Sequence, residues 1–102
     1  YNYYKCKSYE NAKNIFLDLL KDKEELPIYL YGKGGCGKSY LINEHRDILD
    51  KRNINHEVYN KLCSAKGDIA CITDLDFVDM KQKCHIIDMN SCGRVFCDES
   101  SK

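Results

Sequence analysis

No stretch of the sequence is long and apolar enough to span a membrane. A transmembrane helix needs about 18 consecutive apolar residues, and every apolar run here is shorter. The first ten residues, YNYYKCKSYE, also lack the basic-then-apolar order of a secretory signal. We therefore expect a soluble, unprocessed chain with no membrane contact.

The sequence has no excess of charge of either sign, with 16 basic and 16 acidic residues. No overall field draws the chain to a polyanion, so contact with nucleic acid would need a local patch. Proline is also scarce, because Pro27 is the only one, and four of the six glycines lie between positions 32 and 37. With so few breakpoints, 102 residues predict a single domain over 1–102.

None of the seven cysteines is paired in a C-x-x-C motif, and their number is odd. Zinc sites and redox motifs often use that spacing. We interpret the cysteines as reduced thiols of an intracellular, reducing compartment. A metal site made by Cys84, His85, Cys92 and Cys97 is the weaker alternative.

Helical and strand patterns alternate along the first half of the chain. Ser8 can cap a helix over about residues 9–23, where apolar residues recur with a period near 3.6. Pro27 then interrupts the pattern, and Ile28–Tyr31 is typical of a short buried strand. Beyond the glycines, a second apolar stripe predicts one helix from Lys38 to Lys51.

The second half is less regular. Residues 56–60, HEVYN, predict a second strand. Apolar residues recur every third position from Ile69 to Val78, which we interpret as short helical pieces, although 69–73 also fits a strand. CHIIDMN predicts a buried parallel strand at about 84–88, and the C-terminal residues add at most one short strand.

The glycine-rich stretch satisfies the Walker A pattern G-x-x-x-x-G-K-S/T. Such a loop turns its backbone N–H groups toward a phosphate, which requires conformations that glycine tolerates, between a strand and a helix. Lys38 is expected to reach the β- and γ-phosphates, and Ser39 to bind Mg²⁺. The predicted ATP-binding residues are Gly32, Lys33, Gly34, Gly35, Cys36, Gly37, Lys38, Ser39 and Tyr40.

A P-loop enzyme also needs an acidic residue at the end of a neighbouring strand to hold the metal's water shell. Asp88 is the best candidate for this Walker B role and, with Lys38, for catalysis, whereas Asp74 and Asp76 are reserves. The alternative is a purely structural role, in which Asp88 ends the strand and starts a turn. Met89 and Asn90 follow it, so no second acid is adjacent to activate water, and the sequence supports binding better than hydrolysis.

Other polar and aromatic residues have structural interpretations. His45 lies on the apolar face of a predicted helix and His85 inside a predicted strand, where hydrogen-bonded structural histidines are common. Tyrosines alternate with lysines in residues 1–9, a composition that could stack on bases. We prefer a solvated N-terminus for this segment, because no predicted fold context supports nucleic-acid binding.

Three segments resemble the superfamily 3 helicases of replication-initiator (Rep) proteins from small DNA viruses. IYLYGKGGCGKSYL is similar to their strand and Walker A motif, and SAKGDIACI looks like a segment that nanovirus-like initiators carry between the Walker motifs. CHIIDMN stands where their Walker B strand ends. The resemblance spans about residues 27–90.

The resemblance implies an AAA+-like P-loop NTPase fold, a three-layer α/β sandwich with a mainly parallel sheet. It also implies a hexamer that couples ATP hydrolysis to single-stranded DNA translocation during replication, in a host nucleus or cytoplasm. Only 14 residues follow Asp88, which leaves no room for the family's sensor asparagine and arginine finger. We therefore expect a truncated helicase core.

Four other interpretations remain open. GKSYLI and IIDMNS echo the Pif1-like helicases, although Met89 replaces their glutamate. KGGCGKS also fits a partitioning ATPase or a nucleoside or nucleotide kinase. A non-catalytic nucleotide-binding module is the last alternative.

Overall fold

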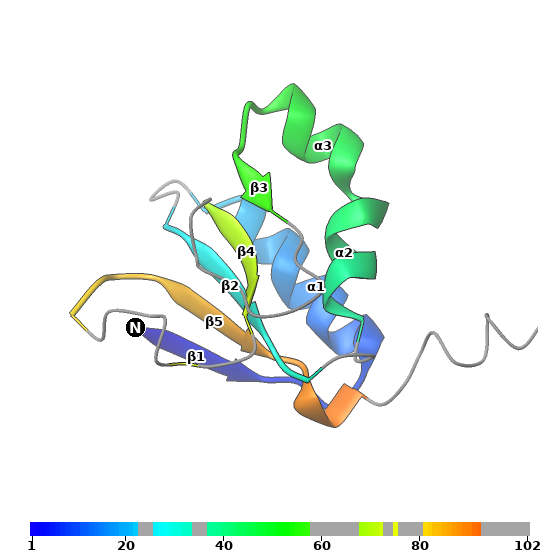
Figure 1. Cartoon of the computed structure of the whole chain (residues 1–102), viewed down its shortest axis with the longest axis vertical. Coiled ribbons are helices and arrows are strands. Elements are labelled where there is room, and N and C mark those ends of the chain that lie inside the picture. Colours follow the sequence, from blue (N-terminus) through cyan, green and yellow to red (C-terminus); the bar gives the residue numbers. More distant parts are fainter. Residues whose placement is uncertain (23–25, 34–36, 58–67, 73–74, 76–80, 93–102) are drawn as a thin grey trace, which may run out of the picture.

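The computed structural model describes residues 1–22, 26–33, 37–57, 68–72, 75 and 81–92. These residues include a five-stranded sheet in the order β1-β5-β2-β4-β3, and every pairing in it is parallel (Figure 1). The strands are β1 (Asn2–Lys5), β2 (Ile28–Tyr31), β3 (His56–Glu57), β4 (Ile69–Ile72) and β5 (His85–Asp88). The predicted α/β class with a parallel sheet is confirmed.

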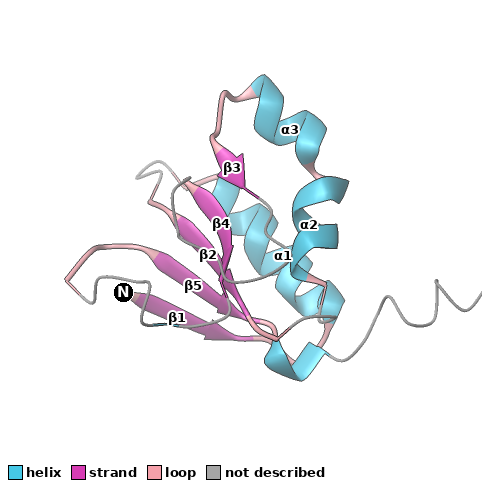
Figure 2. Cartoon of the chain, viewed as in Figure 1, coloured by secondary structure: helices cyan, strands magenta, loops and turns pink. Residues whose placement is uncertain are grey.

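Three described helices lie on one side of this sheet (Figure 2). They are α1 (Tyr9–Leu20), α2 (Lys38–Glu44) and α3 (Arg46–Lys51), and a 3₁₀ turn follows β5 at Asn90–Cys92. The described residues thus account for two layers of the predicted sandwich. None of the described helices has the length and apolar character that a membrane span requires.

The three central strands, β5, β2 and β4, form the middle of the hydrophobic core. β4 and β5 are buried along their whole length, and only the last residue of β2 is partly exposed. Strands covered on both faces read as continuous apolar runs, as IACI and IYLY do here. In the register, Leu30 lies between Cys71 and Ile87, and all three are fully buried.

Helix α1 begins where the sequence predicts. The Ser8 side chain accepts a hydrogen bond from the Asn11 N–H at 3.1 Å, which satisfies one of the free donors of the first turn. Ala12, Phe16 and Leu20 recur every fourth residue and are buried, so one stripe of the helix packs on the core. The helix ends at Leu20, earlier than residue 23, and residues 23–25 lie outside the described part.

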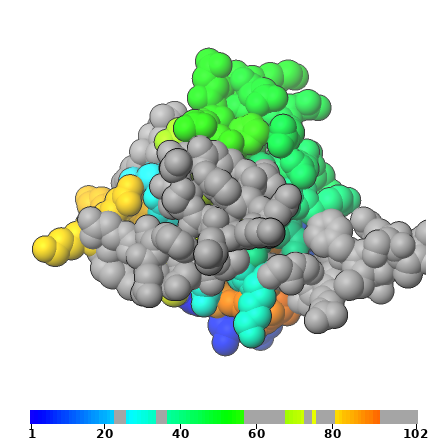
Figure 3. All heavy atoms as spheres, viewed as in Figure 1, coloured from blue at the N-terminus to red at the C-terminus, as the bar shows by residue number. Residues whose placement is uncertain are grey.

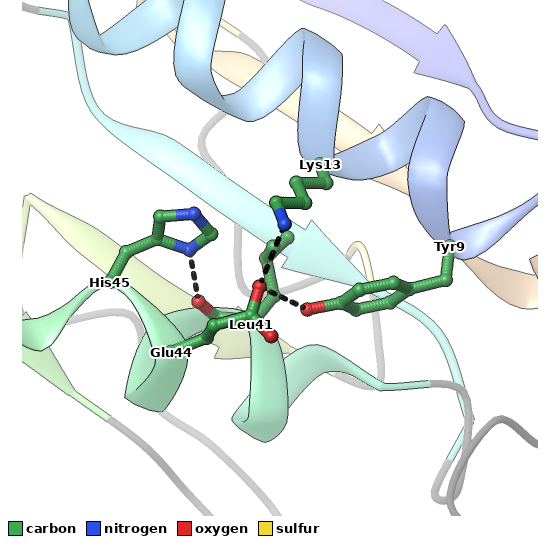
Figure 4. Close-up of polar contacts among 5 residues, drawn as sticks. All are labelled: Tyr9, Lys13, Leu41, Glu44 and His45. Carbon is green, nitrogen blue, oxygen red and sulfur yellow. Dashed lines mark hydrogen bonds and ion pairs between the residues drawn. The ribbon is translucent and has the colours of Figure 1, made fainter.

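The single helix predicted over residues 38–51 is wrong, because the chain breaks into α2 and α3 at His45. The His45 ring Nδ1 donates to the Leu41 carbonyl at 2.8 Å (Figure 4). In a continuous helix the His45 N–H would take that carbonyl. It donates instead to Ile42 at 3.1 Å, which tightens the last turn and ends α2.

Two further expectations differ from the structure. Ile69–Ile72 is a strand and not a helical piece, because four successive buried residues suit a position between β2 and β3. The N-terminus is mostly exposed, as predicted, but it is also ordered, because Asn2–Lys5 forms the edge strand β1 beside β5. The strand predicted at 56–60 is described only at His56–Glu57. Residues 58–60 and the C-terminal residues 93–102 lie outside the described part.

Candidate nucleotide-binding site

The side chain of Lys38, the first residue of α2, folds back over the start of the loop that follows β2. The Lys38 Nζ donates to the carbonyl of Gly32 and, at 3.0 Å, to that of Lys33. Lys38 is only 7% exposed, although it opens helix α2. Its ammonium group is therefore fixed at the start of the glycine loop, where a phosphate-binding lysine is required.

The other predicted loop residues divide into two groups. Ser39 and Tyr40 follow Lys38 in the first turn of α2 and are half-buried. Gly34, Gly35 and Cys36 lie outside the described residues, so their predicted contacts with phosphate stay predictions.

Gly37 adopts a conformation that favours glycine. Its φ is +100°, in the left-handed region, and it immediately precedes α2. A Cβ at this position would lie 3.1 Å from Cδ1 of Tyr9 and 3.6 Å from Cε of Met89. The turn therefore brings the loop backbone against α1 and the end of β5, where a Cβ would crowd the Tyr9 ring and would be strained at this φ.

Gly37→Ala is expected to lower the free energy of unfolding by about 1–2 kcal/mol, because an L-residue is strained at this φ. The new methyl group also pushes on the Tyr9 ring and displaces the loop, so ATP affinity should fall with stability. Urea unfolding and a fluorescent-nucleotide titration measure the two effects. Asn14→Ala, on the exposed face of α1, is the control; it should leave ATP affinity unchanged and should not lower the free energy of unfolding, since alanine favours a helix. Unchanged stability in Gly37→Ala would contradict the left-handed turn.

Asp88 lies at the end of β5, next to the strand that carries the loop. It is the register partner of Tyr31, and it is 6% exposed. The main-chain N–H of the next residue, Met89, donates to the Tyr31 carbonyl at 2.7 Å, which ties the two strand ends together. The reserve candidates Asp74 and Asp76 lie outside the described residues.

Both carboxylate oxygens of Asp88 accept hydrogen bonds. The Tyr3 hydroxyl donates to Oδ2, and the Asn90 N–H donates to Oδ1 at 2.9 Å. Partial burial and the Asp88 carboxylate together raise the pKa of Tyr3 to about 12. The phenol therefore stays protonated, and remains a donor, across the physiological pH range.

Asn90 links this acid to the loop. Its Oδ1 accepts a hydrogen bond from the Lys33 N–H at 3.0 Å, while its own N–H donates to Asp88. The ends of β1, β2 and β5 consequently lie together at one edge of the sheet, and blue, cyan and orange atoms from this part of the chain are visible at the lower edge of Figure 3. A chain of hydrogen bonds thus runs from Tyr3 through Asp88 and Asn90 to the backbone of the glycine loop.

Contacts with α1 hold α2, the helix that follows the glycine loop, in place (Figure 4). Glu44 accepts from the Lys13 ammonium at 3.2 Å and from the Tyr9 hydroxyl at 3.4 Å. Partial burial alone would raise the pKa of Glu44, but the Lys13 ammonium, Tyr40 and His45 hold the pKa below its usual value. The Tyr9 and Tyr40 rings also pack together, with centroids 5.6 Å apart. Both the first turn and the last residue of α2 therefore contact α1.

The two histidines have the structural roles expected of them. His45 is buried against the Phe16 ring and ends α2. His85 is buried at the start of β5, where its Nδ1 lies 3.3 Å from the Asn2 amide nitrogen. Its Nε2 lies 3.6 Å from an Asp22 carboxylate oxygen. Both contacts are at the far end of the strand from Asp88.

The described residues form a cavity away from the loop, and they form no cysteine–histidine metal site. Within the described segments, no group of three or more His, Cys, Asp or Glu residues is arranged to hold a metal ion, and Cys97 lies outside them. A partly apolar cavity lies at the starts of β2 and β4, the opposite end of the sheet from the loop. It is lined by Leu19, Leu20, Leu26, Ile28, Arg52, Asn53, Ile54, Asp68 and Ile69.

A parallel strand, a glycine loop, and a helix whose first residue is a lysine folded over that loop define a P-loop NTPase domain. The family comparison agrees: residues 9–94 match the KAP family P-loop domain, and the chain belongs to this family. No curated protein and no solved structure matches the chain significantly. The family match supports the P-loop and nucleotide-binding predictions, but it lends no support to the superfamily 3 helicase resemblance.

Sequence reasoning missed two residues at this edge. The prediction of a solvated N-terminus gives Tyr3 no role, although the tyrosine-rich segment YNYYK has a composition that favours a strand such as β1. The sequence marks Asn90 only as a residue that cannot serve as a second acid. No local pattern marks its contact with Lys33, since the two are 57 positions apart.

Proposed function

We propose that the chain is an ATP-binding domain of the KAP P-loop class, folded as one unit over residues 1–102, that hydrolyses ATP slowly. The observation that carries this proposal is the Lys38 ammonium, held over the loop by the Gly32 and Lys33 carbonyls. A lysine in this place acts as a point charge on the β- and γ-phosphates. The family match supplies independent support for a P-loop.

The residues present fit a Mg²⁺–nucleotide complex. Ser39 supplies a hydroxyl at the start of α2, and Asp88 supplies a buried carboxylate at the neighbouring strand end. Both are oxygen ligands of the kind that Mg²⁺ and its water shell prefer. When bound, Mg²⁺ neutralises charge on the phosphate oxygens.

Slow turnover follows from the residues after Asp88. Met89 is fully buried and apolar, and the side-chain oxygen of Asn90 is bonded to the loop backbone. Neither residue can take a proton from an attacking water molecule. Such general base catalysis usually contributes about 10²–10⁴-fold to the rate. We therefore propose turnover below about 1 s⁻¹, the lower end of the usual range.

The test is ATP binding with Mg²⁺, followed by phosphate release with and without single-stranded DNA or a nucleoside acceptor. We expect binding, slow phosphate release and no effect of DNA. Absence of binding would contradict the proposal. DNA-stimulated turnover with ring assembly would instead favour a helicase, and phosphate transfer to the nucleoside would favour a kinase.

A further inference from the structure

The edge strand β1 brings the Tyr3 hydroxyl into contact with Asp88, the acid to which the proposed function assigns the water shell of Mg²⁺. β1 runs parallel to β5, with Tyr3 opposite Ile86 and Lys5 opposite Asp88. Tyr3 is thus a diagonal neighbour of Asp88, a separation that aromatic side chains can cross. Its hydroxyl donates to Asp88 Oδ2.

This hydrogen bond fixes the orientation of the carboxylate. An ionised carboxylate has about four acceptor positions on its two oxygens. Tyr3 occupies one on Oδ2 and the Asn90 N–H occupies one on Oδ1, which leaves one on each oxygen for water molecules around a metal ion. With one donor on each oxygen, the carboxyl plane cannot rotate without breaking a hydrogen bond.

The contact is not required for packing of the tyrosine itself. Tyr3 is 44% exposed, so a phenylalanine would keep the same ring position and leave the edge strand paired. Tyr4, on the same strand, has its hydroxyl 3.5 Å from His85 Nδ1, at the start of β5 and away from Asp88. The chain therefore contains a matched pair of tyrosine hydroxyls, and only one of them contacts the acid.

We propose that Tyr3 is a positioning residue for the metal, because its hydroxyl holds Asp88 in the orientation that receives the water shell of Mg²⁺. This inference rests on the proposed function, in which Asp88 binds that shell. Groups outside a metal's direct ligands often change metal affinity by about 10–100-fold when they are removed. Through Tyr3, the N-terminal strand β1 becomes part of the metal site, although this strand lies outside the glycine loop.

The test compares Tyr3→Phe with the wild type by titrating a fluorescent ATP analogue at fixed concentrations of free Mg²⁺. We expect the Mg²⁺ concentration at half-maximal effect to rise about tenfold. Nucleotide affinity in EDTA should not change, because the phosphate contacts of Lys38 do not involve Tyr3. Mn²⁺ binding to the nucleotide complex, followed by electron paramagnetic resonance, gives a second measurement that does not depend on turnover.

Two variants separate the possible outcomes. Tyr4→Phe should behave as the wild type, and Asp88→Asn should raise the Mg²⁺ midpoint at least as far as Tyr3→Phe. If Asp88→Asn raises the midpoint while Tyr3→Phe keeps the wild-type midpoint, the role of Tyr3 is refuted and the proposed function stands. An equal shift in Tyr4→Phe would show a general effect of the edge strand and would also refute it. If the wild type does not bind nucleotide, the proposed function itself fails.

Discussion

Lys38→Ala is expected to abolish ATP binding while the domain stays folded. The Lys38 ammonium is the charged group fixed over the start of the loop, through its contacts with the Gly32 and Lys33 carbonyls. Removing one partner of a buried charge pair costs about 2–5 kcal/mol. That loss corresponds to a fall in affinity of about 30-fold or more.

Two further variants make this result interpretable. Lys38→Met keeps the apolar stem of the side chain, so it should lose binding with less effect on packing. Lys51→Ala, at the exposed end of α3, removes one positive charge elsewhere and should bind ATP normally. Circular dichroism and nucleotide titration measure folding and binding separately. Retained ATP affinity in folded Lys38→Met would contradict the assignment of the loop.

Leu30→Ala is expected to have the largest effect on stability. Leu30 is fully buried in the middle of β2, between Cys71 of β4 and Ile87 of β5. Truncating a buried leucine costs about 2–5 kcal/mol, because apolar contacts are lost and a cavity remains. Since small domains are stable by only about 5–15 kcal/mol, this change removes a large part of the total.

The variant also tests the link between the sheet and the loop. β2 leads directly into Gly32, so loss of its packing should lower the melting temperature and weaken nucleotide binding together. Saturating Mg²⁺–ATP should restore part of the lost melting temperature, because it binds only the folded state. Ile48→Ala, at a 41% exposed position of α3, should change the free energy of unfolding by less than about 0.5 kcal/mol. Equal effects of the two substitutions would contradict the core described for β2.

The sequence predicted those parts of the fold in which local pattern and tertiary role agree. Ile28–Tyr31 and the Ser8 cap are examples, because a continuous apolar run suits a central parallel strand and a serine suits the first turn of a helix. At the site, the glycine spacing identified the loop and Lys38, since the backbone chemistry of phosphate binding is local in the sequence.

The incorrect predictions depend on contacts that the periodicity of the sequence does not specify. Ile69–Ile72 fits a three-residue period, but its place between two strands decides its structure. The break at His45 depends on which donor takes the Leu41 carbonyl, which helical periodicity does not specify. Tyr3 meets Asp88 across 85 positions, and only strand pairing brings them together.

The most direct test of the central claim is to map where Mg²⁺–ATP binds by backbone amide NMR. The account predicts that the largest chemical-shift changes occur in residues 32–40, with smaller changes in Asp88, Met89 and Asn90. Amides around the cavity at the opposite end of the sheet, such as Leu20, Asn53 and Ile69, should change little. Shifts concentrated at that cavity, with none in residues 32–40, would contradict nucleotide binding by the glycine loop.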